Sequence, residues 1–208
     1  DDIRANENAH SRILSSILKI HDSTGENFVI KSFFKMLGEP FSSLVVSAGL
    51  KVKITNEENR IDIKIRDKDY SIIIENKIHG AQDQNRQIER YIEAENKLYK
   101  HEQIYILYLT RQGGSPSDES ISNDLILQFN GRYREISYKI EILDWLNTLL
   151  DEPLQNNCFQ SSVARAAIIQ YKDHLDGIFS QRKGEIEMDE KISKWLEQEL
   201  NIIEKPVN

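Results

Sequence analysis

The sequence contains one cysteine in 208 residues, and this near-absence sets the first limits on the protein. Cys158 has no partner for an internal disulfide, and the chain lacks the cysteine clusters that hold structural zinc. Proteins without disulfides are typical of reducing compartments, so we expect a cytoplasmic location. No signal peptide is recognisable, and no apolar run reaches the ~20 residues of a membrane helix. We therefore expect no membrane partner.

The motifs of two classes of hydrolase are absent from the sequence. There is no Gly-rich phosphate loop, which argues against ATP hydrolysis, and no nucleophile elbow, which argues against a serine hydrolase. Basic residues are also in deficit, with 27 Lys and Arg against 34 Asp and Glu and a net charge of −7. A protein that coats nucleic acid would need the opposite balance. An enzyme with a local basic strip would not, although weak affinity or a partner protein that delivers the substrate is then expected.

A strictly alternating segment occupies residues 59–66. Its three isoleucines recur at every second position, and Asp62 lies among the polar residues between them. Period-two alternation indicates a half-buried strand. A second strand is predicted over residues 70–77 after a short polar turn, and strands joined this closely are typical of an antiparallel hairpin. Pairing of the two strands would place Asp62 beside Glu75.

The two carboxylates would share their face of the hairpin with Lys77, two residues beyond Glu75. Neighbouring carboxylates repel one another, but Mg2+ is commonly bound by one or two carboxylates together with waters and a substrate phosphate. Such an ion stabilises phosphate charge and lowers the pKa of bound water, and Lys77 could stabilise the charge that develops. The pattern indicates phosphodiester hydrolysis. The alternative is an ordinary hairpin with charged surface residues, since acid-x-Lys is common.

Two helices are predicted to flank this hairpin. Gln87 and Tyr91 lie four residues apart in the helix over residues 81–98, so they share a face. Gln87 could contact the water shell of a metal or a phosphate with Tyr91 as support; alternatively, Tyr91 is a core aromatic and Gln87 is solvated. In the helix over residues 6–20, Glu7 lies near the buried face at the N-terminal end. It is either a helix-capping acid or a further acid of the site.

His10, on the same stripe of the first helix, is a candidate ligand or a structural residue. The other predicted elements follow from periodicity and from Gly and Pro positions: helix 26–38, strand 44–54, buried strand 103–110, loop 111–122, strand 134–138, a helix through 150, and helices 160–180 and 186–203. We divide the chain into a core over residues 1–150 and C-terminal helices over 151–208. These helices would pack on the core or pair with a second copy in a homodimer.

The order and spacing of several segments resemble a branch of the PD-(D/E)XK nuclease superfamily known mainly from uncharacterised bacterial proteins. The resemblance runs from about residue 5 to about residue 180. It rests on the following segments: Glu7-Asn8-Ala9-His10-Ser11, Arg60-Ile61-Asp62-Ile63, Ile74-Glu75-Asn76-Lys77, Gln87-Ile88-Glu89-Arg90-Tyr91, Tyr105 to Thr110, and Ile136-Ser137-Tyr138. Ile61 stands where the superfamily's name places proline.

The resemblance implies an α/β fold with a restriction-endonuclease-like core: a central mixed sheet of about four to five strands flanked by helices, with a C-terminal helical extension. It implies a nuclease that cleaves DNA with Mg2+, for which Mn2+ would substitute. The roles it implies are listed here: metal ligands Glu7, Asp62, Glu75 and the backbone carbonyl of Asn76; catalytic residues Asp62, Glu75, Lys77, Gln87 and Tyr91.

By analogy, the setting would be defence against foreign DNA or DNA repair. Candidate nucleic-acid contacts are the basic residues Arg60, Lys64, Arg86 and Arg90, which would otherwise form a solvated face. Two alternatives stay open. One is a non-catalytic module on the same fold that binds nucleic acid or protein. The other is a ribonuclease, because metal-assisted attack on phosphorus does not itself require a particular sugar.

Overall fold

A mixed sheet forms the centre of the computed structural model, which describes residues 2–21, 25–44, 52–151 and 163–180. Within these ranges five strands pair in sequence order: β1 (Lys53–Glu58), β2 (Ile61–Arg66), β3 (Ser71–Lys77), β4 (Ile104–Thr110) and β5 (Tyr133–Ser137). The first three strands are antiparallel, and β3, β4 and β5 are parallel. The predicted mixed sheet and its hairpin are therefore confirmed.

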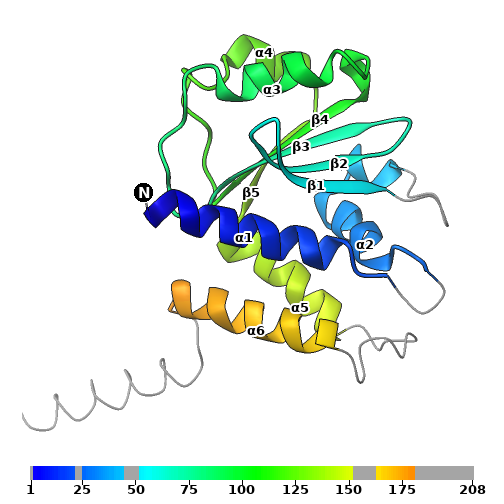
Figure 1. The fold of residues 1–208 in the computed structure, drawn as a ribbon, viewed down its shortest axis with the longest axis vertical. Helices are drawn as coiled ribbons and strands as arrows, with labels where there is room; N and C mark the ends of the chain where they lie inside the picture. Colours follow the sequence, from blue (N-terminus) through cyan, green and yellow to red (C-terminus); the bar gives the residue numbers. More distant parts are fainter. Residues whose placement is uncertain (1, 22–24, 45–51, 152–162, 181–208) are drawn as a thin grey trace, which may run out of the picture.

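Helices cover both faces of the sheet (Figure 1). On one face lie α1 (Asp2–Leu18), α2 (Phe28–Leu37), α5 (Leu143–Asp151) and α6 (Val163–Ile178), and on the other lie α3 (Gln87–Glu95) and α4 (Asn123–Gln128). Short turns of helix occupy Phe41–Ser43, His101–Gln103 and Tyr138–Ile142. This arrangement has three layers, with the sheet in the middle. No helix in the described ranges is long and apolar enough to span a membrane.

The strand β3 is buried along its whole length, because helices pack on both of its sides. Ile72 and Ile74 belong to the larger hydrophobic cluster under α1, α2, α5 and α6. Ile73 belongs to the smaller cluster, together with Ile88 and Tyr91 of α3. The alternation of the strand thus divides its side chains between the two cores.

Several boundaries differ from those predicted. The helix expected over residues 81–98 begins at Gln87, because the backbone N–H groups of Ala81 and Gln84 donate to the side chains of Glu7 and Gln87 instead. The short helix α4 was not predicted. Ile61 packs in the smaller cluster, apart from Ile63 and Ile65 in the larger one.

The departure of Ile61 from the alternation has a local backbone cause. Asn59 and Arg60 adopt left-handed conformations directly before it, so the extended geometry on which alternation depends begins only after the turn. The strand β1, which precedes this turn, begins at Lys53. Most of the strand predicted over residues 44–54 therefore lies outside the described residues, as does the helix predicted over 186–203.

The first C-terminal helix, α6, packs on the core. Its Ile168, Tyr171 and Leu175 belong to the same hydrophobic cluster as the residues of α1 and α5. This is one of the two arrangements expected for the C-terminal helices. The division of the chain near residue 150 stays a prediction.

A buried ion network ties the end of α3 to the sheet. Glu95 and Lys64 are both 0% exposed, and Lys64 Nζ lies 3.3 Å from Glu95 Oε1. Arg66 donates to both oxygens of Glu95, at 2.9 and 2.6 Å, and the Ser71 hydroxyl donates to Oε2 at 2.7 Å. Lys64 and Arg66 also contact Glu58. The prediction that Lys64 contacts nucleic acid is wrong, because its ammonium is enclosed and paired with carboxylates.

Substitution of Glu95 by Ala should destabilise the fold by about 3–5 kcal/mol, because Lys64 and Arg66 would lose their buried carboxylate and share only the partly exposed Glu58. Urea denaturation measures this change. The matched control is Glu93→Ala on the same helix, which removes an ion pair whose two side chains are both 57% exposed. That variant should stay close to the wild type. Equal loss in both variants would contradict the assignment of the network to the core.

Candidate active site

The charged end of β3 meets α3 on one face of the sheet. Lys77 Nζ lies 3.0 Å from Glu75 Oε1, and Gln87 Nε2 donates to the same oxygen at 2.7 Å. The antiparallel register pairs Ile63 with Ile74, so Asp62 and Glu75 occupy the next positions of the two strands. Asp62 Oδ2 accepts the backbone N–H of Asn76 at 2.8 Å. The structure therefore brings together the two predicted carboxylates and the predicted lysine.

Glu75 lies in an electrostatic environment that disfavours its charge. Its side chain is buried, and Oε2 has no hydrogen-bond partner among the described residues. Burial and the nearby Asp62 carboxylate raise the pKa of Glu75 to about 8, and Lys77 opposes this rise only in part. A carboxylate of this kind is a stability cost unless a further positive group compensates it.

Gln87 and Tyr91 form the α3 side of the site. Besides its bond to Glu75, Gln87 Nε2 lies 3.0 Å from the Tyr91 hydroxyl, which in turn donates to the carbonyl of Arg60 at 2.7 Å. Gln87 Oε1 accepts the N–H of Gln84 and lies 3.4 Å from Lys77 Nζ. Tyr91 also belongs to the smaller hydrophobic cluster, so it is a core aromatic and a support of Gln87 at once.

Asp83 is a site residue that the sequence analysis missed. Its side chain is 8% exposed, and Oδ1 lies 3.9 Å from Lys77 Nζ. The Tyr108 hydroxyl lies 3.1 Å from Oδ1, and the backbone N–H of Ser117 donates to Oδ2 at 2.7 Å. In the helix predicted over residues 81–98, Asp83 would lie four residues before Gln87 and share its face, so this spacing was a signal for Asp83 that the sequence analysis did not use. In the structure Asp83 lies in the irregular segment before α3.

The opposite face of β3 holds α1 through Asn76. Its amide nitrogen donates to Ser11 Oγ at 2.9 Å and lies 3.2 Å from the carbonyl of Glu7. Glu7 Oε1 accepts the backbone N–H groups of His79 and Ala81 at 3.2 and 3.0 Å. Glu7 thus anchors the segment after Lys77.

The alternative of a helix-capping Glu7 is wrong, because α1 begins at Asp2, one turn earlier than the capping position would require. The roles of Glu7 and of the Asn76 carbonyl as metal ligands stay predictions.

His10 lies in a cluster of aromatic rings beside this face. Its Nδ1 is 3.0 Å from the Tyr171 hydroxyl, and its ring centroid is 5.1 Å from that of His79 and 5.4 Å from that of His174. Burial, and then the neighbouring His79 and His174, lower the pKa of His10 to about 4. His10 is therefore neutral at pH 7, with a structural contact to α6.

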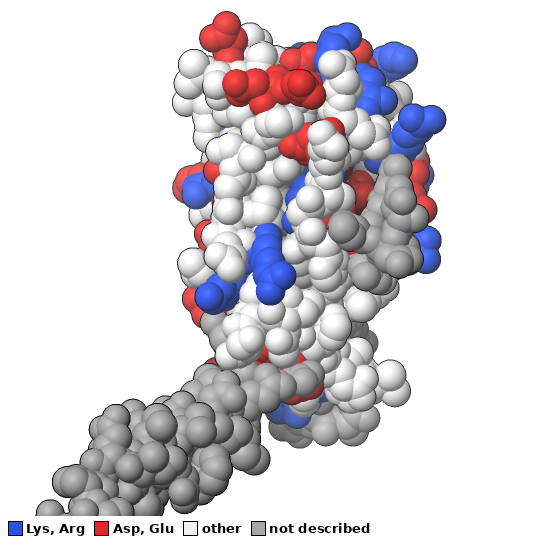
Figure 2. Space-filling view, turned by 90° about the vertical axis from the view of Figure 1, so that its left-hand side faces the viewer, with Lys and Arg blue, Asp and Glu red and all other residues white. Residues whose placement is uncertain are grey.

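A cavity of about 620 Å³ opens at the carboxyl ends of β3 and β4. Lys77, Asp83 and Tyr108 lie in its wall, together with the residues that follow each strand. Figure 2 views the side on which α1 begins and α6 ends. Charges of both signs crowd toward α3 and α4, and the surface below them is mostly uncharged with a small group of Lys and Arg side chains. Of the predicted catalytic residues, Lys77 is the one that lines this cavity.

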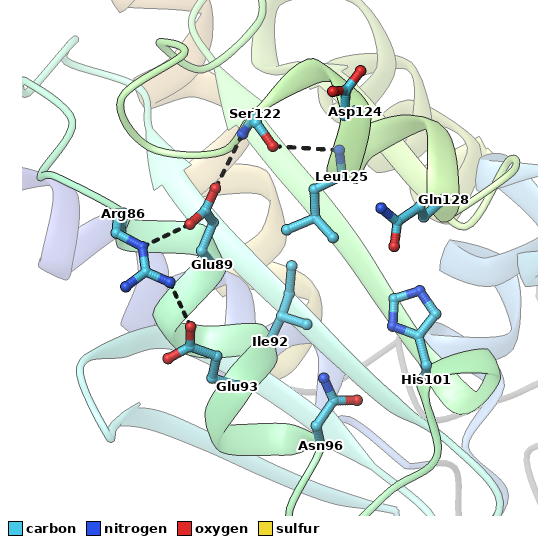
Figure 3. A pocket seen from close by; sticks show the side chains of 10 residues that line it. All are labelled: Arg86, Glu89, Ile92, Glu93, Asn96, His101, Ser122, Asp124, Leu125 and Gln128. Atoms are coloured by element: carbon cyan, nitrogen blue, oxygen red, sulfur yellow. Dashed lines mark hydrogen bonds and ion pairs between the residues drawn. The ribbon is translucent and has the colours of Figure 1, made fainter.

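A second hollow, of about 430 Å³, lies between α3 and α4 (Figure 3). Arg86 lines it and pairs there with Glu89 and Glu93, both of which also face the hollow. Neither Glu75 nor Lys77 lines this space. Because Arg86 is paired with these two glutamates, it is less suited to contact nucleic acid.

Two further basic candidates lie near this part of the chain. Arg90 donates to the side chain of Gln84, and the carbonyl of Arg60 accepts the Tyr91 hydroxyl. Neither Arg60 nor Arg90 lines the cavity beside Lys77. The contacts of Arg60, Arg86 and Arg90 with nucleic acid stay predictions.

A profile of the PD-(D/E)XK nuclease superfamily matches residues 2–173 of the chain. The chain belongs to the PD-(D/E)XK nuclease superfamily. The match covers the whole sheet and every residue of the candidate site. Comparison with curated protein sequences and with solved structures gave no match.

The site of this superfamily member fits a divalent metal that keeps most of its own water. The unpartnered, buried Oε2 of Glu75 beside Asp62 is a position where a cation would relieve repulsion. No group of three or more His, Cys, Asp or Glu side chains suited to a metal occurs in the described ranges. Two carboxylates are few for Ca2+ but ordinary for Mg2+, whose remaining ligands are waters and substrate oxygens. Asp62 and Glu75 would hold the ion.

Wild-type stability should fall as the pH drops from about 6.5 toward 4, relative to that of a His10→Asn variant. The unfolded chain takes up a proton on His10 near pH 6.5, whereas the folded protein resists it to about pH 4. Asn keeps a polar group near the position of Nδ1 and does not titrate. Urea denaturation of both proteins between pH 7.5 and 4.5 measures the difference. Parallel stability curves would show that His10 is not the residue concerned.

Proposed function

We propose that this protein is a Mg2+-dependent nuclease that hydrolyses phosphodiester bonds in DNA. The observation that carries the proposal is the buried Glu75 carboxylate, with one oxygen bound to Lys77 and Gln87 and the other without a partner, beside Asp62. Membership of the superfamily supports nuclease chemistry. The choice of DNA, and a role in defence or repair, rest on family analogy.

Lys77 is positioned to act on a phosphate in the cavity. Its ammonium is held by Glu75, lies near Gln87 and Asp83, and lines the cavity wall. Because these contacts fix it before substrate arrives, its N–H groups can stabilise negative charge that develops on phosphate oxygens at little reorganisation cost. The same ammonium can hold the attacking water.

Gln87 keeps the two charged groups in place. It donates to Glu75, lies next to Lys77, and is itself oriented by Tyr91 and Gln84. Glu75 Oε2 stays without a hydrogen-bond partner among the described residues, and Glu75 and Asp62 are the carboxylates that would hold a cation. A bound Mg2+ would polarise the phosphoryl group and lower the pKa of a coordinated water.

Replacement of Lys77 by Ala should lower the cleavage rate by at least about 100-fold, as does loss of one preorganised donor in other enzymes. Supercoiled plasmid, linear duplex, single-stranded DNA and RNA are incubated with Mg2+, with Mn2+ and with EDTA, and products are resolved on gels. Lys97→Ala, which removes an exposed lysine, is the control. Metal-dependent cutting by the wild type and Lys97→Ala alone supports the proposal. Cutting that Lys77→Ala retains contradicts it, and a preference for RNA would make the protein a ribonuclease.

Substitution of Glu75 by Gln should abolish Mg2+ binding while the fold persists. Gln preserves the shape and the contact with Gln87 but carries no charge for the cation. Titration calorimetry with Mg2+ and with Mn2+ measures this loss, and Glu93→Gln provides a control at an exposed carboxylate. A wild type that binds neither metal, or a variant that binds both as well as the wild type, would count against the site and favour a non-catalytic module.

A further inference from the structure

Arg111 is a cation at the cavity that the proposed mechanism does not use. It directly follows β4, is exposed, and lines the same cavity as Lys77 and Tyr108. Arg66 and Arg86 have carboxylate partners. In the described part of the chain no carboxylate pairs with Arg111.

The end of α6 holds the Arg111 guanidinium in place. Nη2 donates to the carbonyl of Ile178, the last residue of α6, at 2.8 Å. The guanidinium also lies 5.7 Å from the ring centroid of Phe179, and the Arg111 carbonyl accepts the N–H of Lys139. A guanidinium carries five N–H donors, so these contacts orient it and leave donors for a ligand.

Thr110, the residue before Arg111, lines the same cavity and carries an unsatisfied hydroxyl. Its Oγ1 is buried, and it has no hydrogen-bond partner within the described ranges. The parallel register places Thr110 opposite Lys77. A buried hydroxyl without a partner costs free energy, which a ligand oxygen or nitrogen would recover.

We propose that Thr110 and Arg111 form a phosphate subsite, here the β4 subsite, for the nucleic-acid strand that Lys77 acts on. Lys77 and Arg111 line the cavity together with one carboxylate, that of Asp83, so its wall carries an excess of positive charge that favours an anion. Arg is suited to a phosphate because its planar donors match two oxygens at once. The β4 subsite takes a backbone phosphate next to the scissile one. This proposal rests on the proposed nuclease function, and it makes α6 part of the substrate site.

The test is binding of labelled single-stranded and duplex oligonucleotides in EDTA, measured by fluorescence anisotropy between 50 and 200 mM salt, roughly the range over which phosphate contacts show their salt dependence. Arg111→Ala should raise Kd about 5- to 10-fold and reduce the salt slope by about one. Thr110→Val should raise Kd by a smaller factor without loss of thermal stability, since it removes an unsatisfied hydroxyl and keeps the shape.

The control is Arg12→Ala, which changes the net charge equally but removes an exposed arginine paired with Glu57 and absent from the cavity wall. Equal weakening by Arg111→Ala and Arg12→Ala, while the wild type still cuts with Mg2+, would overturn the β4 subsite and leave the nuclease proposal intact. A wild type that neither binds nor cuts nucleic acid would overturn both.

A second variant tests the part played by α6. Phe179→Leu keeps an apolar side chain at the end of the helix but removes the ring under Arg111. As a single substitution it should raise Kd, and combined with Arg111→Ala it should raise Kd no further than Arg111→Ala does alone. Additive effects of the two substitutions would overturn the positioning of Arg111 by α6.

Discussion

The site depends on the burial of β3 between helices on both of its faces. A strand enclosed in this way can end in charged residues only if each face supplies partners for them. On one side Gln87 of α3 contacts Glu75 and lies near Lys77, and on the other Ser11 of α1 accepts from Asn76. The alternation of the strand sends successive side chains to opposite layers. The Glu-Asn-Lys sequence thus joins all three layers at one point.

The two buried glutamates on the α3 face, Glu95 and Glu75, have different surroundings. Glu95 is satisfied by Lys64, Arg66 and Ser71, and its pKa is lowered by its bonds to Arg66 and Ser71, against the effect of burial. Glu75 is equally enclosed, yet one of its oxygens lacks a partner in the described structure and its pKa is raised. The first arrangement serves stability. The second leaves a carboxylate unsatisfied where a cation can bind, as expected where function outweighs local stability.

The segment that connects β3 to α3 is irregular, but specific hydrogen bonds hold it in place. Glu7 and Gln87 each accept backbone N–H groups from residues 79–84, so two side chains replace the helical hydrogen bonds that the segment lacks. Asp83 is then held by Tyr108 and Ser117 beside Lys77. After the end of β4, the last residue of α6 likewise holds the Arg111 side chain through a hydrogen bond. The walls of the cavity therefore come from segments far apart in the chain.

Local patterns were sufficient to predict the strands β2 to β5, the hairpin, and the meeting of Asp62, Glu75 and Lys77, because period-two alternation and a short turn restrict the register. The spacing of Gln87 and Tyr91 likewise predicted their contact. What the sequence could not reveal depends on long-range contacts. Four features depend on how the layers pack: the burial of Lys64 with Glu95, the start of α3 at Gln87, the contact of Asp83 with Lys77, and the contact of Arg111 with α6. Periodicity reports which face of an element is buried; which side chains meet there is decided by the tertiary structure.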